Sequence, residues 1–146
     1  MESVVMCVVQ ALLAAAGDGN VAGVLEALES GADVEWADGE GRRAAHLAAG
    51  GGHIGVLEVL VSRGASLDAR DKRHRLPLHA AIEGGEVGAA EWILGQPGQS
   101  LDVMWHGMTL LMWAARCGSR ACVEWLLDQG ADPWALDWYQ RTALHW

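Results

Sequence analysis

Histidine recurs along this chain at a fixed interval, and histidine is a common metal ligand and acid–base catalyst. His46 and His79 are 33 residues apart, and His145 lies two further intervals on. A metal site needs Cys, carboxylate or additional His ligands close to each of them, and none recurs with them at such spacing. Met112 takes the remaining position of the series, which a metal site would not tolerate. We therefore predict no metal and no cofactor, and expect each histidine to hydrogen-bond to a neighbouring turn.

Three cysteines complete the set of reactive side chains. Cys7, Cys117 and Cys122 are odd in number and lack the spacing of a disulfide framework, which suits reduced thiols in a reducing compartment. Cys117 and Cys122 are not a C-x-x-C pair. Cys117 falls on the predicted concave face, and we interpret it as a packing residue; the alternative is a reactive thiol. No Gly-rich phosphate loop follows a strand, and no Ser/His/Asp, Cys/His or paired-carboxylate group stands out. The chain therefore has no predicted catalytic residue and is not expected to be an enzyme.

The interval of the histidines belongs to a repeat that covers the whole chain. Asp38 opens a unit that reads DGEGRRAAHLAAGGGHIGVLEVLVSRGASLDAR, and further units begin at Asp71, Met104 and Asp137. A fixed period of this length is typical of a solenoid, in which each unit buries its apolar side against its neighbours. We expect one domain, 1–146, whose units are about 5–37, 38–70, 71–103, 104–136 and the partial unit 137–146.

One unit shows how the repeat folds. After an Asp-x-x-Gly turn comes a short apolar helix, AAHLAAGGG, which Gly51 and Gly52 end with a sharp reversal. The next segment, HIGVLEVLVSRG, has apolar residues at helical spacing, and Gly64 ends it in the left-handed conformation. Each unit is therefore predicted to be an extended turn followed by two antiparallel helices, and the fold is all-α.

These strings resemble the ankyrin-repeat family. The residues that carry the resemblance are RRAAHLAA with GGGH, LPLHAA with EGG, TLLMWAA with RCGS and DQGADP, and TALHW, all in phase. The family implies a solenoid of about four helix pairs plus a truncated fifth unit. It also implies a protein-interaction module whose partner lies against the turn tips and the concave face of the first helices.

Departures from the family pattern fall mainly in the middle units. The Thr that caps the first helix is present at Thr109 and Thr142 but is replaced by Arg43 and Leu76. Such a loss costs about 0.5–2 kcal/mol for each cap.

Two further departures concern backbone conformation. His74 occupies a turn position that favours Gly, so a positive φ is expected there. Pro97 stands where a left-handed Gly should end the third unit, and Pro cannot adopt that φ. We expect an irregular loop from Gly95 to Ser100.

Charge is distributed unevenly over the 146 residues. The net charge is −9, with six acidic and no basic residues in 1–37, whereas 42–75 holds seven of the ten Lys and Arg. An acidic chain argues against a nucleic-acid partner. The apolar start lacks the positive segment of a signal peptide, and no apolar stretch reaches the ~18 residues that span a bilayer. Cytoplasmic or nuclear localisation is the expectation, with no membrane contact.

The family's contact surface maps onto specific residues here. The predicted partner-binding residues are Arg42, Arg70, Lys72, Arg73, Arg75, Trp105, His106, Met108, Arg116, Trp138 and Tyr139. Their basic first half and aromatic second half suit a protein or peptide with both acidic and apolar groups. Trp, Tyr and Arg dominate interface energetics, and Trp105 and Trp138 are the strongest candidates. The alternative is that each Trp packs on its neighbouring turn.

The run RDKRHR, from Arg70 to Arg75, permits three interpretations: a nuclear-localisation signal, a contact for an acidic partner, or a solvated basic tip. Glu83 is expected to pair with these basic tips.

Two observations suggest alternative functions: a weaker resemblance to another family and the truncated last unit. GMTLLMWAA and RTALHW are similar to segments of ankyrin-bearing palmitoyltransferases, which would make the chain a substrate-recruiting region of a larger enzyme. Because the last unit stops within its first helix, we also expect a fragment of a longer protein, or an end that another chain covers, including self-association there.

Overall fold

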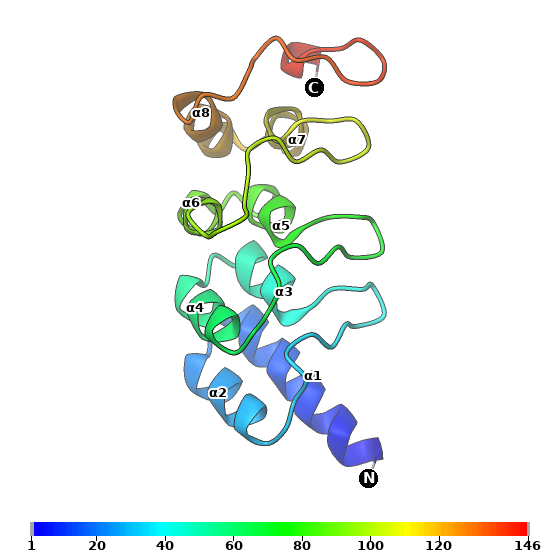
Figure 1. The fold of residues 1–146 in the computed structure, drawn as a ribbon, viewed down its shortest axis with the longest axis vertical. Helices are drawn as coiled ribbons and strands as arrows, with labels where there is room; N and C mark the ends of the chain where they lie inside the picture. Colours follow the sequence, from blue (N-terminus) through cyan, green and yellow to red (C-terminus); the bar gives the residue numbers. More distant parts are fainter. Residues whose placement is uncertain (1, 146) are drawn as a thin grey trace.

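The computed structural model describes residues 2–145, and the last residue of the TALHW string, Trp146, lies outside them. Within this range, eight α-helices stack as four pairs into one elongated array (Figure 1). The pairs are α1 (Glu2–Asp18) with α2 (Val21–Glu29), α3 (Ala44–Gly50) with α4 (Ile54–Ser62), α5 (Pro77–Glu83) with α6 (Val87–Leu94), and α7 (Leu110–Cys117) with α8 (Arg120–Asp128). A 3₁₀ turn, η1 (Ala143–His145), follows. The predicted all-α solenoid with a partial fifth unit is confirmed.

The core runs along the array between two rows of helices. The first helices form one row, in which α3 packs against both α1 and α5, and the second helices form the other. Small side chains such as Ala48 and Ala49 are fully buried in α3, which allows neighbouring helices to approach closely. Larger side chains, including Leu57 and Ile93, fill the space behind them in the second row. Each unit therefore depends on its neighbours for burial.

Glycines end the second helices, and the third unit differs as predicted. Gly64 and Gly130 adopt φ values of 91° and 90°, and the N–H that follows each donates to the carbonyl five residues back. At Pro97 this is impossible, so the left-handed residue moves to Gly98, with a φ of 83°. The N–H of Gln99 then donates to Gln96, three residues back, at 3.3 Å. The expected irregular loop is confirmed.

The first helices begin with two kinds of cap. Thr109 Oγ1 accepts the backbone N–H of Met112 at 3.2 Å, whereas Arg43 and Leu76 make no side-chain cap hydrogen bond. The N–H groups of Arg43 and Leu76 instead donate to Nδ1 of the histidine three residues later, each at 3.2 Å. The predicted loss of the Thr cap in the middle units is thus confirmed. There the histidine accepts the N–H of the cap residue itself, not the N–H three residues into the helix that a Thr hydroxyl accepts.

The first unit is built differently from the others. Its first helix, α1, has 17 residues, compared with 7 in α3. Within residues 2–145, no helix combines the length and the hydrophobicity that crossing a membrane requires.

Candidate functional site

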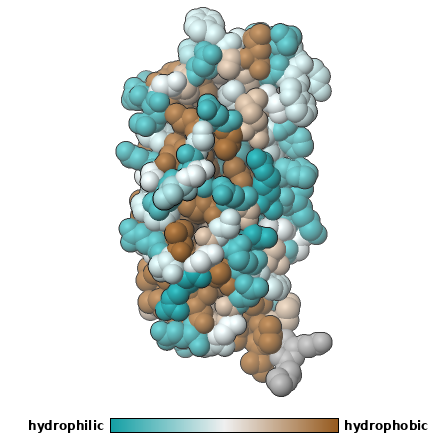
Figure 2. Space-filling model, in the orientation of Figure 1, coloured by the Kyte–Doolittle hydropathy of each residue, from teal (hydrophilic) through white to brown (hydrophobic). Residues whose placement is uncertain are grey.

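The turns that precede α3, α5, α7 and η1 project from the same side of the array and form a row (Figure 1). We number each turn by its repeat unit, so the second turn precedes α3, the third α5, the fourth α7 and the fifth η1. Hydrophilic colours predominate along this side of the molecule (Figure 2). Ten of the eleven predicted partner-binding residues lie in or directly beside these turns, and Arg116 lies on α7, which makes the row the candidate site.

Three of the turns are closed by the same Asp–Arg arrangement. The Oδ1 atom of Asp71 accepts the backbone N–H groups of Arg73 and Arg75, both at 2.9 Å, and its Oδ2 accepts Nε of Arg75 at 2.9 Å. Burial by itself raises the pKa of the Asp71 carboxyl. The hydrogen bonds from the Arg75 backbone and guanidinium outweigh that effect and hold the pKa below its usual value. Asp38 with Arg42, and Asp137 with Arg141, repeat these contacts at 2.9–3.0 Å.

This arrangement changes the interpretation of Arg42 and Arg75. Both guanidinium groups are ion-paired within their own turns, and the Arg75 side chain is only 14% exposed. Arg75 also pairs with Glu83, as expected for that glutamate. Both therefore belong to the framework of their turns, and Arg75 is largely buried, whereas the Arg42 side chain is 43% exposed and stays a predicted contact residue.

The fourth turn has a different construction. Met104 and Met108 occupy the positions of the Asp and the Arg. The turn is closed by an isolated β-bridge, in which the backbone groups of Trp105 and Met108 exchange hydrogen bonds of 3.0 and 2.8 Å. His106 and Gly107 between them have positive φ values of 47° and 77°. Two apolar side chains thus replace the ion pair.

The third turn presents an exposed basic tip. Arg70, Lys72 and Arg73 are all exposed, and Nη1 of Arg70 donates to the carbonyl of His74 at 2.7 Å. His74 adopts a φ of 63°, which confirms the predicted left-handed residue. The N–H of Lys72 donates to the carbonyl of Glu40 at 3.0 Å and so links this turn to the one before it.

The aromatic half of the predicted residues comes together around one depression. It has a volume of about 300 Å³ and lies between the fourth and fifth turns. Its lining residues are Trp105, His106, Met108, Arg116, Asp137, Trp138, Tyr139 and Arg141. Trp138 and Tyr139 are 73% and 77% exposed, so two large aromatic rings face solvent.

Trp105 is less exposed than expected. Its indole N–H donates to the carbonyl of Arg73 in the preceding turn, and its ring centroid lies 4.6 Å from that of Trp113. The guanidinium carbon of Arg116 lies 6.0 Å from the Trp105 ring centroid. Trp105 therefore packs on its neighbouring turn, which was the alternative interpretation, and one part of it still lines the depression.

Met108 and Cys117 are also enclosed. Met108 is only 4% exposed, so it contributes to the depression from within the core and is not an accessible contact residue. Cys117 is half-buried, and burial, followed by the nearby Glu83 carboxylate, raises the pKa of its thiol. The thiolate is therefore disfavoured at Cys117.

Of the recurring histidines, His46 hydrogen-bonds to the neighbouring turn, as predicted, whereas Nδ1 of His79 and of His145 accepts an N–H three residues earlier in its own unit. Nε2 of His46 lies 2.9 Å from the carbonyl of Arg75, and its Nδ1 accepts the N–H of Arg43, so the neutral Nε2–H tautomer fits both contacts. His79 is fully buried, and burial, with a further contribution from Arg70, lowers its pKa to about 4. In His145, Nδ1 accepts the N–H of Thr142 at 3.1 Å. Within the described residues, no three His, Cys, Asp or Glu side chains gather to hold a metal.

Sequence reasoning missed Asp137 and Arg141. Arg141 is ion-paired with Asp137, and its guanidinium carbon lies 4.9 Å from the centroid of the Tyr139 ring. A signal was present, because an Arg follows the turn-opening Asp by four residues in each of these three turns.

Comparison with protein families agrees with this architecture. The family model described as "Ankyrin repeats (3 copies)" matches residues 11–104, and the one described as "Ankyrin repeat" matches residues 106–138. The chain belongs to the ankyrin-repeat family. Ankyrin repeats generally serve as protein-interaction modules. No curated protein gave a match to this ankyrin-repeat chain.

Proposed function

We propose that this ankyrin-repeat chain binds a protein or peptide along its row of turns, with the aromatic depression as the anchoring site. The observation that carries the proposal is the exposure of Trp138 and Tyr139 beside one depression, at 73% and 77%. Large exposed aromatic side chains are costly to leave in water and are typical of binding hot spots.

The basic tip of the third turn supplies the second part of the surface. Arg70, Lys72 and Arg73 are exposed on the turn that Trp105 joins to the depression through its hydrogen bond to Arg73. Their charges suit carboxylates on the partner, and a rim of charges mainly raises the association rate. The partner is therefore a segment with an apolar or aromatic side chain near acidic residues.

A matched pair of tryptophan substitutions tests this proposal. Trp134 is 69% exposed but lines a separate depression beside α7 and α8, so it controls for the loss of one exposed indole. Affinity capture with Trp138→Ala should lose the partner, whereas capture with Trp134→Ala should retain it. Equal capture by both variants, with folding intact by circular dichroism, would contradict the proposed site.

A further inference from the structure

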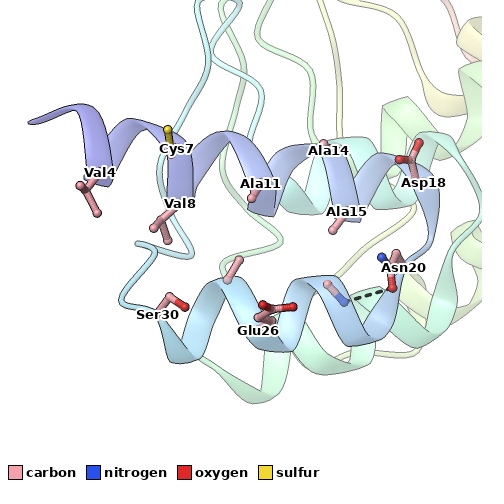
Figure 3. A pocket seen from close by; sticks show the side chains of 12 residues that line it. Val4, Cys7, Val8, Ala11, Ala14, Ala15, Asp18, Asn20, Glu26 and Ser30 are labelled. Carbon is pink, nitrogen blue, oxygen red and sulfur yellow. Dashed lines mark hydrogen bonds between the residues drawn. The ribbon is translucent and has the colours of Figure 1, made fainter.

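A second concave surface lies at the N-terminal end of the array, before the first of the turns in the sequence. It is a groove of about 610 Å³ between α1 and α2 (Figure 3). Lining residues recur every three or four positions from Val4 to Asp18 on α1 and from Asn20 to Ser30 on α2. One face of α1 therefore forms one wall of the groove, and one face of α2 forms the other.

The groove and its edge are apolar. Val4, Val5 and Met6 on α1 are 65%, 58% and 42% exposed. Figure 2 shows hydrophobic side chains beside the N-terminal end of the molecule. Ala11 and Ala14 line the groove with small, exposed side chains, which leave room for a close approach. An exposed apolar surface of this kind marks an interaction site.

The shape favours a helix as the occupant. The stretch from Val4 to Asp18 covers 14 residue steps, which corresponds to about 21 Å, or four helical turns. Both walls are helices, and ridges of side chains on a third helix fit between such walls. A peptide that binds by adding a strand needs the free edge of a sheet, which these walls do not offer. Val9, Leu12 and Ala16 of α1 turn towards the core, and most of the groove-lining face stays exposed, although Ala15 is buried near Gly23 of α2.

Charge defines the chemistry of that helix. The carboxylates of Asp18 and Glu26 line the groove, and no Lys or Arg is among its lining residues. We infer that the groove binds an amphipathic α-helix of a partner protein, with aliphatic residues on one face and Lys or Arg on its flanks. This inference does not depend on the function proposed for the turns.

A second copy of the chain fits the groove less well. Two of the exposed apolar residues at the other end, Leu127 and Trp134, lie close in sequence to exposed carboxylates, at Asp128 and Asp132 respectively. Stacking that end on the groove brings carboxylates towards the acidic α1–α2 face, and like charges oppose such contact.

Designed peptides provide the probe. The Leu/Lys peptide is a synthetic helix of about 15 residues, long enough to span the groove, with Leu along one face and Lys on the others. The control is a Leu/Glu peptide, in which Glu replaces every Lys. In titration calorimetry with the full chain, the Leu/Lys peptide should bind at least about tenfold more tightly than the Leu/Glu peptide. Amide chemical-shift changes should concentrate in α1 and α2. Failure of the Leu/Lys peptide to bind, or shifts centred elsewhere, overturns the inference.

Two neighbouring positions on α1 give matched variants. Ala11 lines the groove, whereas Gln10 is exposed but does not line it, so Ala11→Arg and Gln10→Arg make the same change in charge. Ala11→Arg should weaken binding of the Leu/Lys peptide about tenfold, and Gln10→Arg should change it by less than about twofold. Equal effects contradict the groove as the binding site. A wild-type dimer that Ala11→Arg converts to a monomer in sedimentation velocity would assign the groove to a second copy and overturn the inference.

Discussion

The carboxylate of Asp71 holds the guanidinium of Arg75, four residues later in the same turn, through contacts of 2.9 Å to both Nε and Nη2. Asp71 is only 5% exposed, so the pair is formed almost out of contact with water. In the fourth unit the equivalent residues are Met104 and Met108, and a β-bridge closes the turn. The two positions have changed together, which indicates that they act as a unit.

Removing one member of the pair should destabilise the array. Asp71→Ala leaves the backbone N–H groups of Arg73 and Arg75 without their acceptor and leaves Arg75 paired with Glu83 alone. We expect a loss of about 2–4 kcal/mol in the free energy of unfolding, measured by urea denaturation. Asp102→Ala, at an exposed carboxylate, is the control and should cost less than about 0.5 kcal/mol.

Replacing both members should cost less than the sum of the single changes. The double variant Asp71→Met with Arg75→Met reproduces the side chains of the fourth turn. A double-mutant cycle should give a favourable coupling of about 1–3 kcal/mol between the two residues. Additive single effects would show that the pair contributes nothing as a pair.

Gly41 is the turn glycine whose replacement should be most damaging. It has a φ of 74°, and a Cβ there would lie 2.7 Å from the backbone nitrogen of Lys72 in the next turn. Gly41→Ala should lower the free energy of unfolding by about 1–3 kcal/mol. Gly39, two residues earlier, has open space around it, so Gly39→Ala should be nearly neutral. Thermal unfolding of both variants checks this, and equal melting temperatures would contradict the close approach of the turns.

Acid should unfold the array partly through His79. Burial first, and then Arg70, lowers the pKa of its imidazole from 6.5 to about 4. Between these values the unfolded chain binds more protons than the folded chain, so stability is complete above pH 6.5 and is lost as the pH falls towards 4. The contribution is about 3 kcal/mol. His79→Gln should flatten the dependence of unfolding free energy on pH in this window, and an unchanged slope would contradict the assignment.

Substitution of Trp105 should lower the free energy of unfolding more than substitution of Trp138, although both side chains line the depression. Trp105 packs on Trp113 and donates to the carbonyl of Arg73, so Trp105→Ala should cost about 2–3 kcal/mol. Trp138 is 73% exposed, and Trp138→Ala should cost less than about 1 kcal/mol. Denaturation midpoints distinguish the two, and Trp138→Ala is accordingly the cleaner probe of binding.

Much of the fold was predictable because the residues that begin and end the helices recur in successive units. The glycines at the ends of helices recur in phase, and so does the histidine of the first helix in three of the units, so the structure of one unit predicts that of the others. Even the irregular loop followed from a local rule, since Pro97 cannot adopt the left-handed conformation and Gly98 adopts it instead.

The division of the surface between structural and binding roles was not predictable from residue types. Arg75 and Arg73 are both basic residues of one turn, yet one is buried against Asp71 and the other is exposed. The burial of Trp105 depends on a carbonyl 32 residues earlier, which only the stacking of units brings within reach. The sequence predicted that one half of the contact surface is aromatic. The packing of the units determines that Trp138 faces solvent and that Trp105 is partly buried.

Hydrogen exchange of the chain with and without its captured partner tests the central claim most directly. If the row of turns is the contact surface, exchange should slow in 70–75, 105–108 and 137–141 and stay unchanged in α4 and α6. Slowing confined to the second helices, with the turns unaffected, would contradict it.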